Sequence, residues 1–231
     1  MTSTVTWSML ESHASHLRNV LLYGPPGTGK SFLAAHAGLP EGKHAFEIPC
    51  TADTTYAEVV GHYVMRDGSF EFASGAALLA MREGSRVVFN DVHNASDALL
   101  DTLFAVADSK DSARFVLSTT GEIVTPADGF TVWLTSNGSP DDLPDGIRDR
   151  FPVAVEVTEP NPSAVDALPP DLQPMARTLA AHPDDDRRMP MRALFEFARL
   201  RDVIGHDDAA KFTFGNRWRE VIEALTLGEN R

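Results

Sequence analysis

An eight-residue phosphate-loop pattern constrains the fold of this chain more than any other feature. The apolar residues 20–23 predict a buried strand, and G-x-x-x-x-G-K-S follows directly, before a helical pattern that starts at residue 30. Glycines in such a loop let backbone N–H groups turn toward a phosphate, and the helix N-terminus adds a favourable dipole. The lysine would reach the β- and γ-phosphates, and the serine hydroxyl would bind Mg²⁺. The predicted nucleotide-binding residues are Gly24, Pro25, Pro26, Gly27, Thr28, Gly29, Lys30 and Ser31.

Apolar runs alternate with helical patterns through the first two thirds of the chain. Besides 20–23, buried strands are predicted at residues 86–89, 131–135 and 153–157. Helices are predicted between them at residues 30–37, 76–83 and 96–107. This alternation predicts an α/β fold with a mostly parallel sheet covered by helices on both faces.

A cluster of prolines marks a change in the pattern. Five prolines lie between residues 160 and 174, which predicts an irregular connector. Helices are predicted beyond it at residues 175–181, 190–204 and 218–227. The helical spacing of Phe212, Phe214 and Trp218 predicts a small apolar core there. We therefore expect an α/β domain over 1–159 and a small all-helical domain over 160–231.

The charge and the cysteine content limit the function and the compartment. The chain has 231 residues with a formal net charge of −13, and residues 1–159 carry 10 Lys/Arg against 21 Asp/Glu. An acidic body disfavours a protein that coats nucleic acid or an anionic membrane. No apolar run approaches the roughly 20 residues that span a bilayer, and the N-terminus has no secretory pattern. The single cysteine, Cys50, is typical of a reducing compartment, so we expect a cytoplasmic protein.

Several ordered motifs together resemble the AAA+ ATPases, specifically the MoxR-like clade related to dynein motor modules. The phosphate loop has the AAA+ form, and residues 54–61 are similar to the clade's T-x-x-D-L-x-G segment. Residues 67–72 resemble the hairpin that this clade inserts within its second helix, and 75–84 its next helix. Residues 121–124 lie where the clade has a hairpin before sensor 1. The resemblance implies a P-loop NTPase core with a helical lid and the use of ATP and Mg²⁺; no guanine-reading N-K-x-D motif occurs.

The segment that resembles Walker B departs from the family pattern. The usual Asp-Glu pair is Asn90-Asp91 here, so Asn90 takes the position that organises the metal-bound water and Asp91 that of the catalytic glutamate. Asn accepts a hydrogen bond but adds no charge, and an Asp base is one methylene shorter than Glu. In the other register Asp91 organises the metal and Val92 takes the position of the base, but a valine side chain cannot accept a proton. The first register therefore predicts slow hydrolysis.

Three further motifs supply polar groups for the phosphates. Asn137 follows the strand at 131–135 and resembles sensor 1, which orients the attacking water. Residues 143–151 resemble the family's L-P-x-x-L-x-D-R-F, which makes Arg150 the arginine finger for a neighbouring subunit, with Arg148 as the alternative. Arg192, in the first turn after Pro190, resembles sensor 2 and would contact the γ-phosphate within its own subunit.

The resemblance implies a ring oligomer, a hexamer, that remodels a partner protein, one that carries a von Willebrand A-type domain. An arginine that acts in trans requires the neighbour. Two other classes remain open: a nucleotide-controlled scaffold that barely hydrolyses ATP, and a nucleic-acid motor or loader, which the acidic core disfavours.

Overall fold

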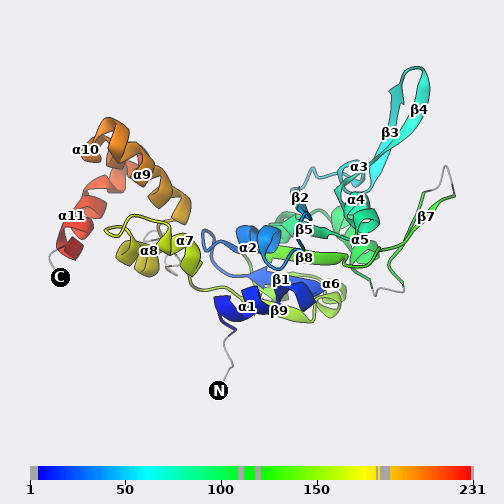
Figure 1. Ribbon diagram of the computed structural model, residues 1–231, viewed down its shortest axis with the longest axis horizontal. Helices are drawn as coiled ribbons and strands as arrows, with labels where there is room; N and C mark the ends of the chain where they lie inside the picture. Colours follow the sequence, from blue (N-terminus) through cyan, green and yellow to red (C-terminus); the bar gives the residue numbers. More distant parts are fainter. Residues whose placement is uncertain (1–4, 109–111, 118–120, 181, 183–187, 230–231) are drawn as a thin grey trace. The chain divides into compact units, whose positions relative to one another are not determined.

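The computed structural model in Figure 1 describes residues 5–108, 112–117, 121–180, 182 and 188–229. The chain forms two compact units. The first holds residues 1–24 and 30–156, and the second holds 25–29 and 157–231.

A five-stranded parallel sheet forms the centre of the first unit. Its strand order is β2-β5-β8-β1-β9, and each neighbouring pair is parallel. The strands are β1 Asn19–Tyr23, β2 Ala45–Pro49, β5 Arg86–Asn90, β8 Thr131–Ser136 and β9 Val153–Glu156. The four predicted strands are confirmed, and β2 is an additional strand at the sheet edge.

Helices and short turns connect these strands (Figure 1). The predicted helices at 30–37, 76–83 and 96–107 are confirmed within a residue at each end. The helices of this unit are α1 Trp7–His13, α2 Lys30–His36, α3 Tyr56–Val59, α4 Ala76–Glu83, α5 Asp97–Ala107 and α6 Asp145–Arg150. The helix α1 was not predicted. This α/β arrangement confirms the predicted fold class.

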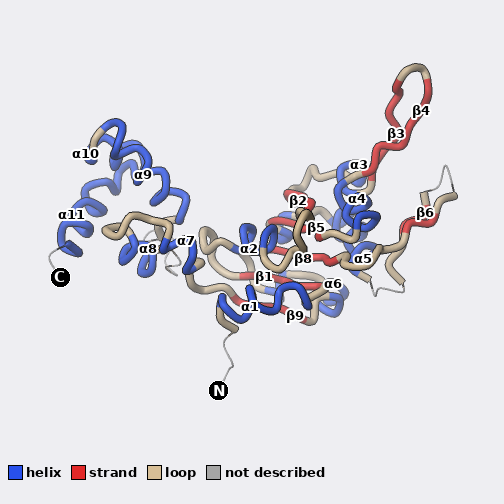
Figure 2. Tube along the Cα trace, in the orientation of Figure 1, coloured by secondary structure: helices blue, strands red, loops and turns tan. Residues whose placement is uncertain are grey.

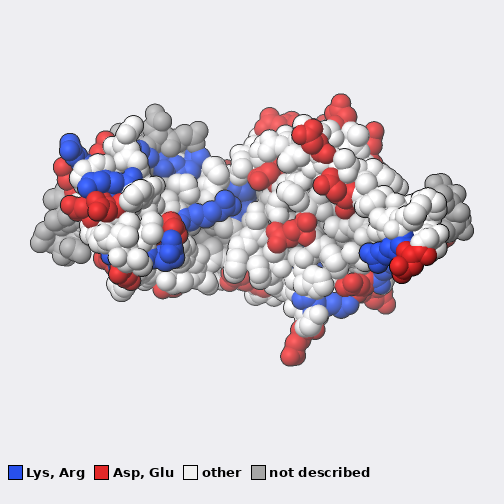
Figure 3. Space-filling model, turned by 90° about the horizontal axis from the view of Figure 1, so that it is seen from above, with Lys and Arg blue, Asp and Glu red and all other residues white. Residues whose placement is uncertain are grey.

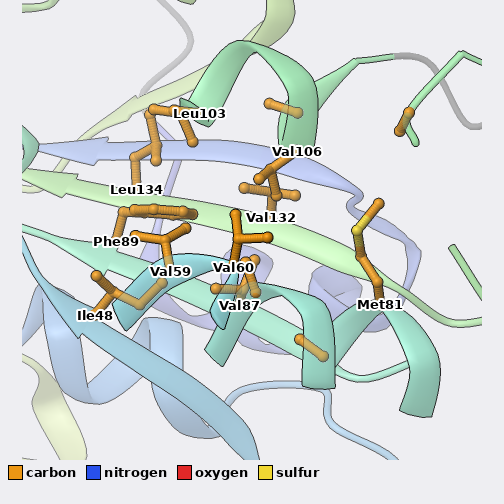
Figure 4. Packing of buried hydrophobic residues seen from close by; sticks show 14 of the residues in the cluster. Ile48, Val59, Val60, Met81, Val87, Phe89, Leu103, Val106, Val132 and Leu134 are labelled. Carbon is orange, nitrogen blue, oxygen red and sulfur yellow. The ribbon is translucent and has the colours of Figure 1, made fainter. Parts of the chain in front are cut away.

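One face of the sheet packs an apolar core, which Figure 4 shows from close by. Alternate residues of the two central strands point to this face: Val87 and Phe89 from β5, and Val132 and Leu134 from β8. They meet Leu103, Val106, Val59, Val60 and Met81 from the covering helices, and all of these side chains are fully buried. Each such side chain contributes about 1.5–3 kcal/mol through removal from water. This core fixes which face of β5 and β8 is left for other contacts.

The opposite face of the same strands carries polar residues toward their carboxyl ends. Asn90 ends β5, and Thr135 lies near the end of β8. The helix α2 contacts β2, β5 and β8. The hydrogen bond from Lys30 to Asn137, which directly follows β8, places the carboxyl end of this strand near the start of α2.

Two antiparallel hairpins extend away from the sheet (Figure 1). The first pairs β3 Gly61–Arg66 with β4 Ser69–Ser74 through a turn at Asp67 and Gly68, both with positive φ (49° and 82°). Such turns match the right-handed twist of a hairpin. The second pairs β6 Phe115–Val116 with β7 Ile123–Val124; residues 118–120 between them lie outside the described part. Both predicted hairpins are confirmed.

In the second unit the described elements are all helical, as Figure 2 shows by colour. They are α7 Pro162–Asp166, α8 Gln173–Leu179, α9 Met191–Ile204, α10 His206–Phe214 and α11 Trp218–Glu229. Among the described residues, no helix is both long and apolar enough to cross a membrane.

Two expectations for this unit were wrong. The proline segment is not an irregular connector throughout, because Pro162 occupies the first turn of α7 and Pro174 that of α8, where a missing N–H costs nothing. Phe212 is not a core residue: it is 79% exposed on α10, whereas Phe214 and Trp218 pack against the buried cluster. Helical spacing placed these rings near one another without fixing which face is buried. Ala181, Arg187 and the acidic residues 184–186 lie outside the described residues.

Candidate nucleotide site

The buried lysine of the phosphate loop has two oxygen partners in the first unit. Lys30 begins α2 and is 5% exposed. Its Nζ donates to the carbonyl oxygen of Gly24, at 2.8 Å, and to Oδ1 of Asn137, at 3.0 Å. Ser31 follows on the first turn of α2 and is half-buried. A buried ammonium requires such partners, and phosphate oxygens satisfy the same donors.

The other loop residues, 25–29, group with the second unit. The Thr28 carbonyl accepts a hydrogen bond from the Asn161 N–H at 3.0 Å. Gly27 has a φ of +83°, and a Cβ there would lie 3.2 Å from the Pro190 Cα, directly before α9. A side chain at position 27 would be strained by the positive φ and would crowd Pro190. Arg192 is the second residue of α9, and its side chain is exposed.

Asn137 joins the phosphate-loop lysine to the proposed base. Its Nδ2 donates to Oδ1 of Asp91 at 3.1 Å, while its Oδ1 accepts from Lys30. The structure thus brings together Lys30, Asn137 and Asp91, which the sequence placed on three separate segments. The backbone N–H of Asn137 donates to Nδ1 of His93 at 3.2 Å, which requires that this ring nitrogen carries no proton.

Asp91 directly follows β5 and has a left-handed conformation, with φ 58° and ψ 47°. Asp and Asn tolerate this region better than other residues with side chains. The Asp91 N–H donates to Oγ1 of buried Thr135 at 3.0 Å. This bond holds the turn that presents the carboxylate beside Asn137.

Asn90 has two side-chain partners. Its Oδ1 accepts from the Thr135 hydroxyl at 3.1 Å, and its Nδ2 donates to Oε2 of Glu47 at 2.8 Å. Among the described residues, no group of three His, Cys, Asp or Glu side chains could hold a metal ion. A magnesium site built from Ser31, a phosphate and water needs no such cage, so these residues fit the predicted cofactor.

The two candidate finger arginines lie on α6 and contact their own unit. The half-buried Arg150 donates from Nη1 to the Gly146 carbonyl at 3.0 Å, and its guanidinium carbon lies 5.0 Å from the Phe104 ring centroid. Its Nε is buried without a hydrogen-bond partner among the described atoms. Arg148 forms ion pairs with Asp145 and, at 2.9 Å, with Asp141, and the hydrogen bond to Asp145 raises the pKa of its guanidinium.

Sequence reasoning missed Glu47, Thr135 and His93. Thr135 is fully buried and lies one residue before the end of β8, yet a Thr in an apolar strand carries no signal by itself. The role of Glu47 depends on the pairing of β2 with β5, which a single sequence does not display.

Comparison with known proteins identifies the family. Residues 19–151 match the AAA domain of the dynein-related subfamily, which is more than half of the chain. The chain belongs to this family. Its resemblance to MoxR-like and dynein-related AAA+ ATPases is therefore confirmed, and membership implies the use of nucleotide and Mg²⁺.

Three relatives illustrate the range of this AAA family. The chain is 28% identical to protein NorQ of Paracoccus denitrificans over 160 residues, 68% of this chain and 58% of NorQ. It is 30% identical to an uncharacterised protein of Staphylococcus saprophyticus over 59% of this chain and 54% of that protein. It is 28% identical to midasin of Dictyostelium discoideum over 57% of this chain and 2% of midasin. The chain thus spans little more than half the length of these two bacterial relatives.

Proposed function

We propose that this AAA-family chain binds Mg·ATP and hydrolyses it slowly. The observation that carries the proposal is the Asn137 carboxamide, which bonds Lys30 on one side and Asp91 on the other. Lys30 would hold the β- and γ-phosphates and Ser31 the metal, with Asn90 ordering a metal-bound water. Asp91 would accept the proton of the attacking water, and Asn137 would orient that water. Arg192 would contact the γ-phosphate.

Asp91 is the reason to expect a slow reaction. An aspartate reaches about one methylene less far than a glutamate, and a displacement of ~1 Å can lower a rate about 100-fold. The metal side also lacks the charge of an aspartate, since Asn90 is neutral. Both features also favour the second candidate function, a scaffold whose state is set by bound ATP with almost no turnover.

The finger arginine supports a ring in which each site is completed by a neighbour. Arg150, or alternatively Arg148, would reach the ATP of the next subunit, and an arginine in that role is worth about 10³-fold or more in rate. An arginine in this role requires a neighbouring subunit, so we propose a homo-oligomer, a hexamer.

The two hairpins are the proposed contact with a partner protein. Each exposes one apolar cross-strand pair: Met65 with Phe70 (67% and 71% exposed), and Val116 with Ile123 (56% and 61%). Arg82 joins the two hairpins, because it donates to Ser74 Oγ at 2.8 Å and pairs with Glu122 at 2.6 Å. A partner with a von Willebrand A-type domain is the family's implication, and remodelling of that partner is part of this proposal.

The charge distribution disfavours nucleic acid as the partner. On the face drawn in Figure 3, acidic side chains are scattered over the α/β unit, and the helical unit carries basic and acidic side chains together. A cytoplasmic location remains part of the proposal.

Binding and turnover of ATP by the wild type and by Lys30→Ala test this function. We expect Mg²⁺-dependent ATP binding and slow phosphate release for the wild type, and neither for the variant. Lys43→Ala removes a lysine outside the candidate site and serves as the matched control. Binding of ATP without turnover would favour the second candidate function, the nucleotide-controlled scaffold. Equal binding of ATP by the wild type and Lys30→Ala would refute the proposal.

A further inference from the structure

The carboxylate of Glu47, on β2, lies beside the neutral side chain of Asn90, on the neighbouring strand β5. In the register of β2 and β5, Pro49 lies opposite Asn90 and Glu47 opposite Val88. Ile48 and Phe89 point into the apolar core, so Glu47 and Asn90 share the other face of the sheet. Their side chains meet there, with 2.8 Å between Asn90 Nδ2 and Glu47 Oε2.

The hydrogen-bond chain fixes which way the Asn90 amide points. Thr135 Oγ1 accepts the Asp91 N–H, so its own proton is free to go to Asn90 Oδ1. A carboxylate only accepts, so the atom of Asn90 that faces Glu47 must be the NH₂ group. The chain runs from the Asp91 N–H through Thr135 and Asn90 to Glu47, with every donor matched to an acceptor. Such chains polarise and strengthen one another.

We propose that Glu47 is a positioning residue for the metal side of the ATP site. It holds the Asn90 carboxamide with its oxygen away from β2, and it supplies, one hydrogen bond away, the negative charge that Asn90 lacks. Residues 47 and 90 thus form an acid–amide pair that replaces a single aspartate. The inference rests on the proposed function, because it needs Mg·ATP at Lys30 and Ser31.

The pair also explains why an aspartate at position 90 would be unfavourable here. Asn90→Asp would place two carboxylates at a contact that is now 2.8 Å long, where like charges repel. The exchanged pair, Glu47→Gln with Asn90→Asp, keeps one negative charge and one amide-to-carboxylate hydrogen bond. The two substitutions are therefore expected to compensate one another.

The test is the Mg²⁺ concentration that gives half-maximal binding of a fluorescent ATP analogue. Loss of an outer partner of a metal site costs about 10–100-fold in metal affinity, so we expect Glu47→Gln to raise this concentration about 10-fold. Binding of the analogue in EDTA should not change. The exchanged pair should return to within about threefold of the wild type, while Asn90→Asp alone should not. Glu71→Gln, on the exposed hairpin, removes the same charge as a control.

The outcomes separate this inference from the proposed function. If the wild type binds with Mg²⁺ dependence and Glu47→Gln requires the same Mg²⁺ concentration, the inference is wrong and the proposed function stands. If Glu47→Gln is weakened but the exchanged pair is no better, Glu47 is only structural and the inference is also wrong. If the wild type binds no ATP analogue, the proposed function fails and this inference fails with it. Thermal unfolding of each variant, unchanged within about 2 °C, excludes loss of the fold as the cause.

Discussion

Arg86 provides a demanding test of how the phosphate-loop helix is held in place. Its side chain is 1% exposed at the start of β5, and Nη1 donates to the Ala34 and Ala37 carbonyls at 2.8 and 2.7 Å. These carbonyls close the C-terminal end of α2, where a cation also interacts favourably with the helix dipole. Its guanidinium carbon lies 4.0 Å from the Trp133 ring centroid. Burial lowers the pKa of Arg86 to about 10, which leaves it charged at neutral pH.

These contacts set the contribution of Arg86 to the free energy of unfolding. A hydrogen bond to a charged donor contributes about 1.5–3 kcal/mol, and the stacking on Trp133 adds about 1–2 kcal/mol. Desolvation of the guanidinium offsets several kcal/mol of this. Arg86→Met removes the donor to the Ala34 and Ala37 carbonyls and to Thr131 Oγ1. A buried acceptor that loses its donor costs about 1–3 kcal/mol, so we expect a loss of about 3–5 kcal/mol in the free energy of unfolding.

Urea unfolding followed by tryptophan fluorescence measures this loss. Trp7 and Trp133 report on the α/β unit, and circular dichroism supplies a second probe. Arg66→Met, on the exposed face of β3, is the matched control and should change stability by less than about 0.5 kcal/mol. Destabilisation by Arg86→Met of less than about 1 kcal/mol would refute the reasoning, because the buried charge would then contribute little to holding α2.

Three further predictions concern other parts of the chain. Cys50 is 3% exposed and burial raises its pKa to about 12, so we expect thiol labelling at pH 8 to be slow in the folded protein and fast in urea; fast labelling of the native state would contradict this. The hydrogen bond from Arg201 lowers the pKa of Asp171 from 3.8, so this pair stabilises the helical unit above that pH and the stabilisation is lost as the pH falls below it. Asp171→Asn should therefore lower stability by about 1–2 kcal/mol at pH 7, and this difference should shrink as the pH falls below 3.8, which pH-dependent melting measures. Gly61→Ala should destabilise the first hairpin, because a Cβ there would lie 2.3 Å from the Ala73 carbonyl oxygen at a φ of +130°; an unchanged melting temperature and unchanged proteolysis of the hairpin would contradict this.

Contiguous signals were sufficient to predict much of the fold. Four strands follow from apolar runs, and the phosphate loop from glycine spacing, because each is encoded in adjacent residues. The strand β2 was not predicted, because Glu47 and Pro49 interrupt its apolar run, as expected for an edge strand with one face outside the core. Phe212 was misplaced because helical spacing does not say which face of α10 is buried.

The candidate site could be predicted only in part, since its geometry depends on pairing between distant strands. Lys30, Asn137 and Asp91 were named from separate motifs, and the structure brings them together. Glu47 and Thr135 could not be named, because they contact Asn90 and Asp91 only when β2, β5 and β8 lie in register.

Single-turnover hydrolysis of ATP by Asp91→Asn tests whether Asp91 is the group that accepts the proton of the attacking water. The substitution keeps the size of the side chain and an acceptor for Asn137 Nδ2, and it removes only the base. We expect the variant to bind Mg·ATP as tightly as the wild type and to cleave it at least about 100-fold more slowly. If Asp91→Asn cleaves ATP at the wild-type rate, Asp91 is not the group that accepts the proton, and the proposed role of this residue is wrong.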